Sequence, residues 1–379
     1  MNGLIILATM NQWIWHTHDL YTYSGYASFP YTFTDSLDRP VILFREKWNL
    51  NKSKGNQWIC FWWKDMTWSV DTLPWIGTQG GRWPGPWCFM GNEDSLWIVE
   101  LNLDPFPLPR YSFYHGLGDT WDTLPSLLDT LAPYQDSPQD VFLDSLGLPV
   151  VVAVDTQDFS VGLGIYRFRG GVWQREWVPD CPYFGGYVEA QEDSSGHIHI
   201  IRVGASSNHV VYLTNETGSW TWELVDSVID GDFFWSSAWM FIDRFNQLHV
   251  FYDPYMYSIG TYQVRYAFRD TLKQWLVVDT SIAWTGVMSN HVVDGNGVIH
   301  FACVDSPAVY HWHKIAGQPG PWAKELIIST GGDDASALCM AVDKQDYLHL
   351  GHCSFFIKHI YYATTNPDIR VSESSPRQK

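Results

Sequence analysis

Histidine follows aspartate by six residues in four segments of the chain, and this spacing is the first feature that could support chemistry. The four pairs are Asp193 with His199, Asp243 with His249, Asp294 with His300, and Asp343 with His349. An imidazole beside a carboxylate is an arrangement that general acid–base catalysis uses. A catalytic group is needed only once, however, whereas a structural contact recurs in every repeat. We therefore predict that these histidines hydrogen-bond or pack against the aspartate turn and have a structural role.

Other titratable residues lie between the repeated segments and match the residue types of carbohydrate-active enzymes. His291, Tyr187 and Arg202 fit a polysaccharide lyase, in which a histidine or tyrosine base acts with an arginine that neutralises a uronate. Glu189 and Asp232 fit a glycoside hydrolase, which needs two carboxyl groups about 5–9.5 Å apart. These residues are the catalytic candidates if the protein is an enzyme.

Aromatic side chains in the same segments are candidates for binding a sugar without any reaction. Flat aromatic faces stack on sugar rings, while carboxylates accept hydrogen bonds from sugar hydroxyl groups. The candidates for a ligand site are Trp75, Trp83, Trp235, Trp284, Tyr187 and Arg202. Packing between repeats is the alternative explanation, because single surface aromatics are common in folded proteins.

Metal-binding patterns are present but incomplete. Three histidine pairs have the spacing that places both rings on one face of a strand: His16 with His18, His197 with His199, and His311 with His313. Zinc would need a third ligand, which we expect from another repeat. Two acidic pairs could bind calcium, although solvated acidic loops are the simpler interpretation: Asp230 with Asp232, and Asp333 with Asp334. We therefore predict no metal site and no cofactor, with calcium as the one alternative.

One unit of about fifty residues recurs along the chain and carries these side chains. We call the first residue of its turn the anchor; the anchors are Asp35, Gly91, Asp144, Asp193, Asp243, Asp294 and Asp343. A tryptophan precedes every anchor by 19 to 23 residues: Trp13, Trp68, Trp121, Trp173, Trp220, Trp275 and Trp322. Two independent markers that agree at seven positions indicate seven repeats.

Each repeat offers four short strands, with a tight turn at the anchor between the first and the second. One such sheet cannot bury both faces, whereas radial stacking of several sheets buries them and leaves short edges. The seventh repeat has no tryptophan strand after its third strand, but residues 12–15 resemble residues 219–222. We therefore predict an all-β, seven-bladed β-propeller over residues 1–370, with four-stranded blades and the N-terminal strand in the last blade. Residues 371–379 are predicted to be a flexible C-terminal tail.

The repeat resembles a class of bacterial β-propeller repeats with the pattern Asp-x-x-Gly-x-x-His before a strand. These repeats are loosely allied to sialidase-like (BNR-like) propellers, and the resemblance covers nearly the whole chain. The resemblance implies the fold and a location outside the cell or in its envelope, but it says little about activity. The sialidase Asp box, Ser-x-Asp-x-Gly-x-Thr-Trp, and a recognisable arginine triad are absent, which argues against sialidase activity.

The formal charge of −18 argues against nucleic acid as a partner, because an acidic surface repels a phosphate backbone. The apolar stretch at the N-terminus is too short to cross a bilayer and lacks a basic segment before it. We expect a monomer that recognises a glycan or protein ligand through the channel-mouth face without catalysis. The alternative is a carbohydrate-active enzyme, either a polysaccharide lyase or a glycoside hydrolase, with its site on the same face.

Overall fold

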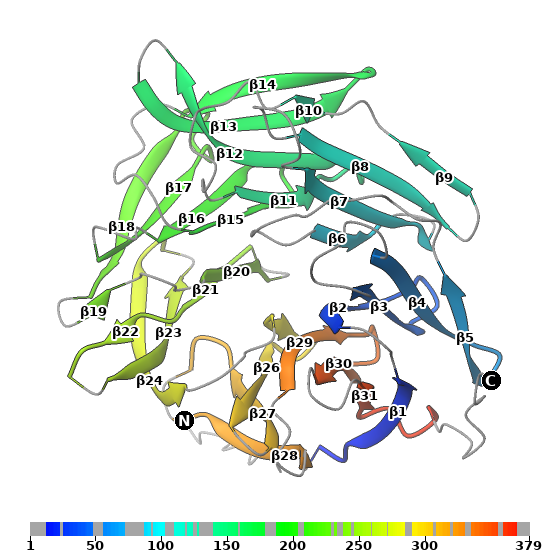
Figure 1. Cartoon of the computed structure of the whole chain (residues 1–379). Coiled ribbons are helices and arrows are strands. Elements are labelled where there is room, and N and C mark those ends of the chain that lie inside the picture. Colours follow the sequence, from blue (N-terminus) through cyan, green and yellow to red (C-terminus); the bar gives the residue numbers. More distant parts are fainter. Residues whose placement is uncertain are drawn as a thin grey trace, which may run out of the picture.

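The computed structural model describes most of the chain in segments. They are residues 13–22, 26–47, 56–72, 87–91, 94–102, 110–117, 120–123, 127–128, 139–157, 160–178, 187–203, 208–228, 231–232, 238–243, 246–258, 260–270, 272–284, 290–305, 308–318, 321–329, 335–354 and 359–369. These segments form seven antiparallel sheets around a common centre (Figure 1). The prediction of a seven-bladed β-propeller is therefore confirmed. No helix among the described residues is long and apolar enough to cross a membrane.

We number the blades in chain order, and each begins at the innermost strand. Blade 1 contains β2 (Tyr26–Thr34), β3 (Pro40–Lys47), β4 (Asn56–Lys64) and β5 (Thr67–Thr72). Blade 2 contains β6 (Trp87–Met90), β7 (Leu96–Asn102), β8 (Arg110–Leu117), β9 (Thr120–Thr123) and β10 (Leu127–Leu128). Blade 3 contains β11 (Gln139–Leu143), β12 (Pro149–Gln157), β13 (Ser160–Arg169) and β14 (Val172–Val178). Blade 4 contains β15 (Tyr187–Glu192), β16 (Ile198–Val203), β17 (His209–Thr214) and β18 (Thr221–Ser227).

The remaining blades complete the ring. Blade 5 contains β20 (Ala238–Ile242), β21 (Leu248–Tyr252), β23 (Thr261–Arg269) and β24 (Trp275–Trp284), with β19 (Gly231–Asp232) and β22 (Tyr255–Met256) added to the same sheet. Blade 6 contains β25 (Val292–Val293), β26 (Val298–Asp305), β27 (Ala308–Ile315) and β28 (Ala323–Ser329). Blade 7 contains β29 (Ala335–Val342), β30 (Leu348–Ser354), β31 (His359–Thr364) and β1 (His16–Thr22).

The anchor turns have the geometry that their residues predict. In blade 4, the Asp193 carboxylate accepts the backbone N–H groups of Ser195 and His197 at 2.8 and 2.9 Å. The residue three after each anchor has a positive φ of 57° to 84°: Asp38, Asp94, Gly147, Gly196, Asn246, Gly297 and Asp346. Glycine, asparagine and aspartate are the residues that adopt this backbone region most readily, so the turn explains their recurrence.

The N-terminal strand closes the ring as predicted. Strand β1 pairs antiparallel with β31 as the fourth strand of blade 7, and His16 lies opposite Thr364. The strand begins at His16, three residues after Trp13. Trp13 is partly buried and packs against the hydrophobic cluster between blades 6 and 7.

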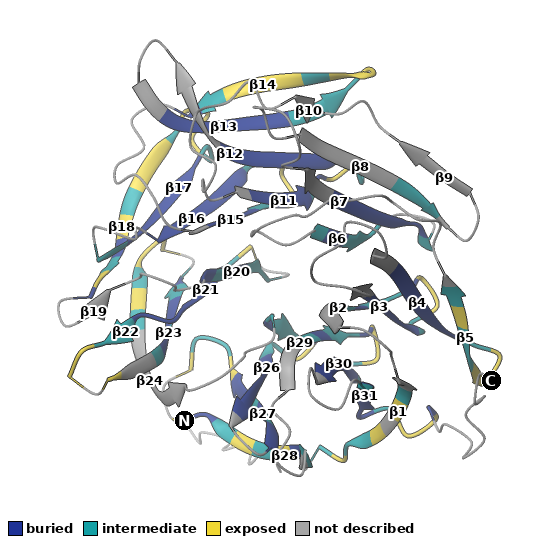
Figure 2. Cartoon of the chain, in the orientation of Figure 1, coloured by how far each residue is buried: buried dark blue, intermediate teal, exposed yellow. Residues whose placement is uncertain are grey.

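The recurring tryptophan packs at the interface between its own blade and the blade before it; we call such an interface a seam. Trp275 packs edge-on against Tyr212, Trp322 against Tyr266, and Trp68 against Tyr362, with ring centroids 5.3, 6.2 and 4.9 Å apart. Each pair joins the third strand of one blade to the outer part of the next. The core therefore lies between the blades, while outer strands such as β14 and β18 expose many of their residues (Figure 2).

Side chains on the innermost strands, or just before them, also link neighbouring blades. Asp140, Asn290 and Cys339 each stand four residues before an anchor and accept a backbone N–H of the following blade, from Ala190, Met340 and Thr32 at 2.7, 2.7 and 3.2 Å. The same position therefore performs the same structural task in three blades. This repetition matters for the interpretation of Asp140, whose carboxyl group is also part of the candidate site.

Candidate functional site

The structure places only part of the predicted site. Trp75, Trp83 and Trp235 lie outside the described residues, as do the acidic candidates Asp230, Asp333 and Asp334. Tyr187, Asp232 and Trp284 have their backbones in strands β15, β19 and β24, but their side chains lie outside the description. The roles of all these residues, calcium binding included, stay predictions. Glu189, Arg202 and His291 are fully described.

Glu189 and Arg202 lie on neighbouring strands of blade 4 but face opposite ways. In the register of β15 and β16, Arg202 is opposite Val188, whereas Glu189 is opposite Ile201. Cross-strand partners share a face of the sheet and successive residues alternate, so Arg202 and Glu189 project from different faces. Arg202 is 1 % exposed and therefore lies inside the blade stack. The structure does not bring these two candidates together.

His291 is enclosed by aromatic rings just before β25. Its imidazole stacks on Phe251 with centroids 3.7 Å apart and lies tilted against Phe301 with centroids 4.8 Å apart. Neither ring nitrogen has a hydrogen-bond partner among the described residues. Burial holds the pKa of His291 well below its usual value of 6.5. A general base must lie within hydrogen-bond reach of the proton that it removes. This packed position therefore favours a structural role for His291 over a catalytic one.

A pair of carboxyl groups that the sequence did not suggest lies on the innermost strands of blades 3 and 4. Asp140 accepts the N–H groups of Val141 and Ala190 at 2.8 and 2.7 Å. Burial raises the pKa of Asp140 to about 7, although these N–H groups lower it. Burial also raises the pKa of Glu189 well above its usual value, and the charge of Asp140 raises it further. Two such neighbours resist ionising together, so they titrate as a pair.

The pair has a positional signal that sequence reasoning missed. Asp140 and Glu189 each stand four residues before an anchor, so a ring of repeats places them at the same level of adjacent innermost strands. Chemically, one protonated and one ionised carboxyl group offer a hydrogen-bond donor beside an acceptor. The same combination can supply a general acid and a general base near neutral pH.

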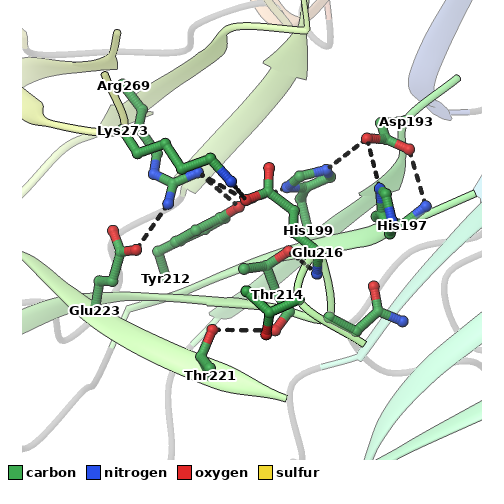
Figure 3. Close-up of polar contacts among 12 residues, drawn as sticks. Asp193, His197, His199, Tyr212, Thr214, Glu216, Thr221, Glu223, Arg269 and Lys273 are labelled. Carbon is green, nitrogen blue, oxygen red and sulfur yellow. Dashed lines mark hydrogen bonds and ion pairs between the residues drawn. The ribbon is translucent and has the colours of Figure 1, made fainter. Parts of the chain in front are cut away.

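The repeated histidines form a second polar arrangement, which links the anchor to the third strand. In blade 4, Nε2 of His199 lies 3.5 Å from the Asp193 carboxylate, and Nδ1 lies 2.6 Å from the Tyr212 hydroxyl (Figure 3). Blades 5 and 7 repeat this arrangement with Asp243, His249 and Tyr266, and with Asp343, His349 and Tyr362. The predicted contact between histidine and the aspartate turn is confirmed. We call this arrangement the Asp–His–Tyr relay.

Charged residues of blade 5 contact the relay of blade 4. Arg269 stacks over the Tyr212 ring at 4.7 Å and pairs with Glu223 at 2.7 Å and Glu216 at 3.3 Å (Figure 3). Lys273 adds a contact of 2.8 Å to Glu216. Because each group has a partner inside the seam, this network is suited to joining the blades rather than to receiving a ligand.

Replacement of a relay histidine tests its structural role. We expect His249→Ala and His300→Ala to lower the free energy of unfolding by about 1–3 kcal/mol, because each leaves buried polar partners unsatisfied. His209→Ala is the control, since this side chain lies at an exposed hydrogen bond to Ser227, and it should change stability by less than about 0.5 kcal/mol. Urea unfolding measures both effects. A His249 variant with unchanged stability but no ligand binding would contradict the structural assignment.

Seven blades closed by the chain's own first strand define the protein as a seven-bladed β-propeller. The sequence matches no protein-family model and no curated protein sequence. Among solved structures it is similar to an ulvan lyase bound to a GlcA(1-4)Rha3S unit, at 11 % identity and a TM-score of 0.61, with 92 % of this chain and 95 % of that chain covered.

Two further structures show the same architecture. The chain is similar to a protein of unknown function from Dyadobacter fermentans, at 13 % identity and a TM-score of 0.50, with 92 % of this chain and 97 % of that chain covered. It is also similar to a mutant of AofleA from Arthrobotrys oligospora, at 13 % identity and a TM-score of 0.51, with 83 % and 90 % covered. At such low identity these similarities establish the fold and leave the activity open.

Proposed function

We propose that this propeller binds a glycan next to the innermost strands of blades 3 and 4, and that binding does not require catalysis. The observation that carries the proposal is the Asp140–Glu189 pair. Glu189 is partly exposed, and its pKa is raised by burial and by Asp140. A sugar hydroxyl group both donates and accepts hydrogen bonds, so a carboxyl pair that keeps a proton matches it in both directions.

Two further features support a glycan ligand. The sequence places tryptophans in the segments that precede the innermost strands of blades 2, 5 and 6, and their faces could stack on sugar rings that extend across the ring from blades 3 and 4. The ulvan lyase, which shares the fold, is bound to a glucuronate–rhamnose unit. The proposed site lies at the ring centre, where side chains from several blades of a propeller come close together.

A glycoside hydrolase is the second candidate function, and the same carboxyl pair favours it. Hydrolysis of a glycosidic bond needs one protonated and one ionised carboxyl group, and raised pKa values supply the protonated one at neutral pH. Asp140 is then the partner of Glu189 in place of the expected Asp232. Lyase chemistry has less support, because the His291 ring is enclosed by aromatic rings and Arg202 is buried inside the blade stack.

Glycan binding can be tested on an array that includes neutral and uronate-containing polysaccharides. For a glycan that binds, we expect Glu189→Gln to weaken the affinity about tenfold, because a neutral amide replaces the ionisable carboxyl group and its charge-assisted hydrogen bond. Glu176→Gln is the matched control, since the amide oxygen can still accept the Trp220 indole N–H on the outer edge of the ring. An unchanged affinity in Glu189→Gln would exclude this position for the site.

Incubation of the bound glycan then separates the functions. Binding without cleavage supports the binding propeller. New reducing ends that disappear in Glu189→Gln support the hydrolase, whereas unsaturated uronate products indicate the lyase.

A further inference from the structure

Blade 6 departs from the Asp–His–Tyr relay in its third strand. His311 on β27 occupies the place that tyrosine has in blades 4, 5 and 7, since it pairs with Ala302 two residues after His300. Its Nε2 lies 3.0 Å from Nδ1 of His300, and Nε2 of His300 lies 3.3 Å from the Asp294 carboxylate. The relay is therefore kept, with an imidazole in place of the phenol.

The hydrogen-bond order of this relay determines which nitrogen of His311 carries the proton. His300 must present an N–H to the Asp294 carboxylate, because the alternative tautomer would face a lone pair toward a negative charge. Its Nδ1 is then an acceptor, so Nε2 of His311 is the donor, as the tyrosine hydroxyl is in the other blades. Nδ1 of His311 consequently holds a lone pair that points away from the relay.

That lone pair meets two further ligand atoms on the same face of the sheet. Glu325 on β28 is the cross-strand partner of His311, and His313 is two residues along β27. One ligand atom from each residue lies within 4.8 Å of the others, and Nδ1 of His311 and Nε2 of His313 are each 3.6 Å from a Glu325 oxygen. His311 is fully buried, and these two nitrogens have no hydrogen-bond partner among the described residues. Three possible ligand atoms therefore converge in one place.

We propose that His311 Nδ1, His313 Nε2 and the Glu325 carboxylate bind one Zn²⁺ ion. Two imidazoles and a carboxylate are a donor set that zinc favours, and three protein ligands leave one coordination position open. His300 and Asp294 then act as outer partners that orient His311, as the hydrogen-bonded carboxylates of known zinc sites orient their histidines. In blade 5, the relay tyrosine Tyr266 is followed by Phe268, which has the register position of His313.

The site also explains why blade 6 differs from its neighbours. It lies against the segment that enters the closing strand: the Trp13 backbone N–H bonds to Glu325, and the Trp13 and Trp15 rings lie 6.1 and 5.4 Å from His311. A bound ion fixes Glu325 and through it Trp13. Zn²⁺ therefore ties the N-terminal segment to blade 6 and stabilises ring closure.

The experiment is titration of the chelator-treated full chain with Zn²⁺ by calorimetry, together with melting temperature with and without the ion. We expect one Zn²⁺ per chain and a melting temperature that rises with Zn²⁺ and falls again on chelation. Removal of an outer partner costs about 10–100-fold in metal affinity. His311→Tyr removes a direct ligand, so its Zn²⁺ affinity should fall by more than this. It should keep the metal-free melting temperature of the wild type, because it restores the relay of the other blades.

Two more variants keep the proposal falsifiable. Glu325→Gln retains an acceptor for the Trp13 N–H but loses the charged ligand, so it should lose Zn²⁺ binding. This variant provides an independent test if His311→Tyr does not fold. Tyr266→His gives blade 5 the imidazole without a second histidine and should add no second binding event. The proposal is wrong if the wild type binds no Zn²⁺, or if His311→Tyr or Glu325→Gln binds it as tightly as the wild type.

Discussion

A chain that lacks residues 1–22 is expected to lose its cooperative unfolding transition. Without β1, strand β31 exposes an unpaired edge along its whole length, and the seam between blades 6 and 7 loses Trp13. Removal of a fully buried tryptophan costs about 3–5 kcal/mol, and the partly buried Trp13 contributes a part of such an amount to the about 5–15 kcal/mol that stabilises a typical domain. Loss of a whole strand with it should leave little of that stability.

Two chains that differ only by the closing segment provide the comparison. One begins at residue 13 and the other at residue 23, and circular dichroism follows their thermal unfolding. A synthetic peptide of residues 13–22 added to the shorter chain should restore the transition, because it can pair with β31 in trans. Equal melting temperatures for the two chains would show that β1 does not hold the ring together.

Acid should destabilise the protein steeply, because several buried histidines stay neutral in the folded state. Burial lowers the pKa of His352 to about 3, and it also lowers the pKa values of His199, His249 and His291. The unfolded chain takes up these protons below about pH 6.5, whereas the folded chain does not. Each such histidine therefore removes about 1.4 kcal/mol per pH unit as the pH falls from 6.5 toward its folded pKa.

His352→Phe isolates one part of this effect. The imidazole stacks on Tyr361 with centroids 4.7 Å apart, and neither ring nitrogen has a hydrogen-bond partner among the described residues, so phenylalanine can replace its packing. We expect a lower acid midpoint, a smaller slope of stability between pH 6.5 and 4, and little loss of stability at pH 8. Urea unfolding across this pH range measures the slopes. An unchanged slope in His352→Phe would refute the assignment.

The fold could be predicted because its signals are local and recur. Six of the seven anchors are aspartates, and every anchor is followed three positions later by a residue that tolerates positive φ. A tryptophan that packs between neighbouring blades precedes each anchor. Those patterns need no knowledge of which blades are neighbours. The residue at which β1 begins could not be read from the sequence, because Trp13 and Trp15 suit a strand as well as they suit packing between blades 6 and 7.

The site was harder to predict because it depends on contacts between segments. Asp140 and Glu189 are 49 residues apart and become neighbours only when the ring aligns their innermost strands. The third ligand expected for a histidine pair was sought in another repeat. Glu325 instead lies directly opposite His311 in the same blade, a relation that only the strand register reveals.

The pairing of His16 with Thr364 has a consequence for connectivity. The two ends of the closing blade are neighbours in the register, so a short linker between them would make the backbone continuous around the ring. New termini could then open in a surface turn of another blade, where the loss of one short connection has a small entropic effect. Circular permutation should therefore yield a folded ring whose closing seam has moved to the blade that was cut.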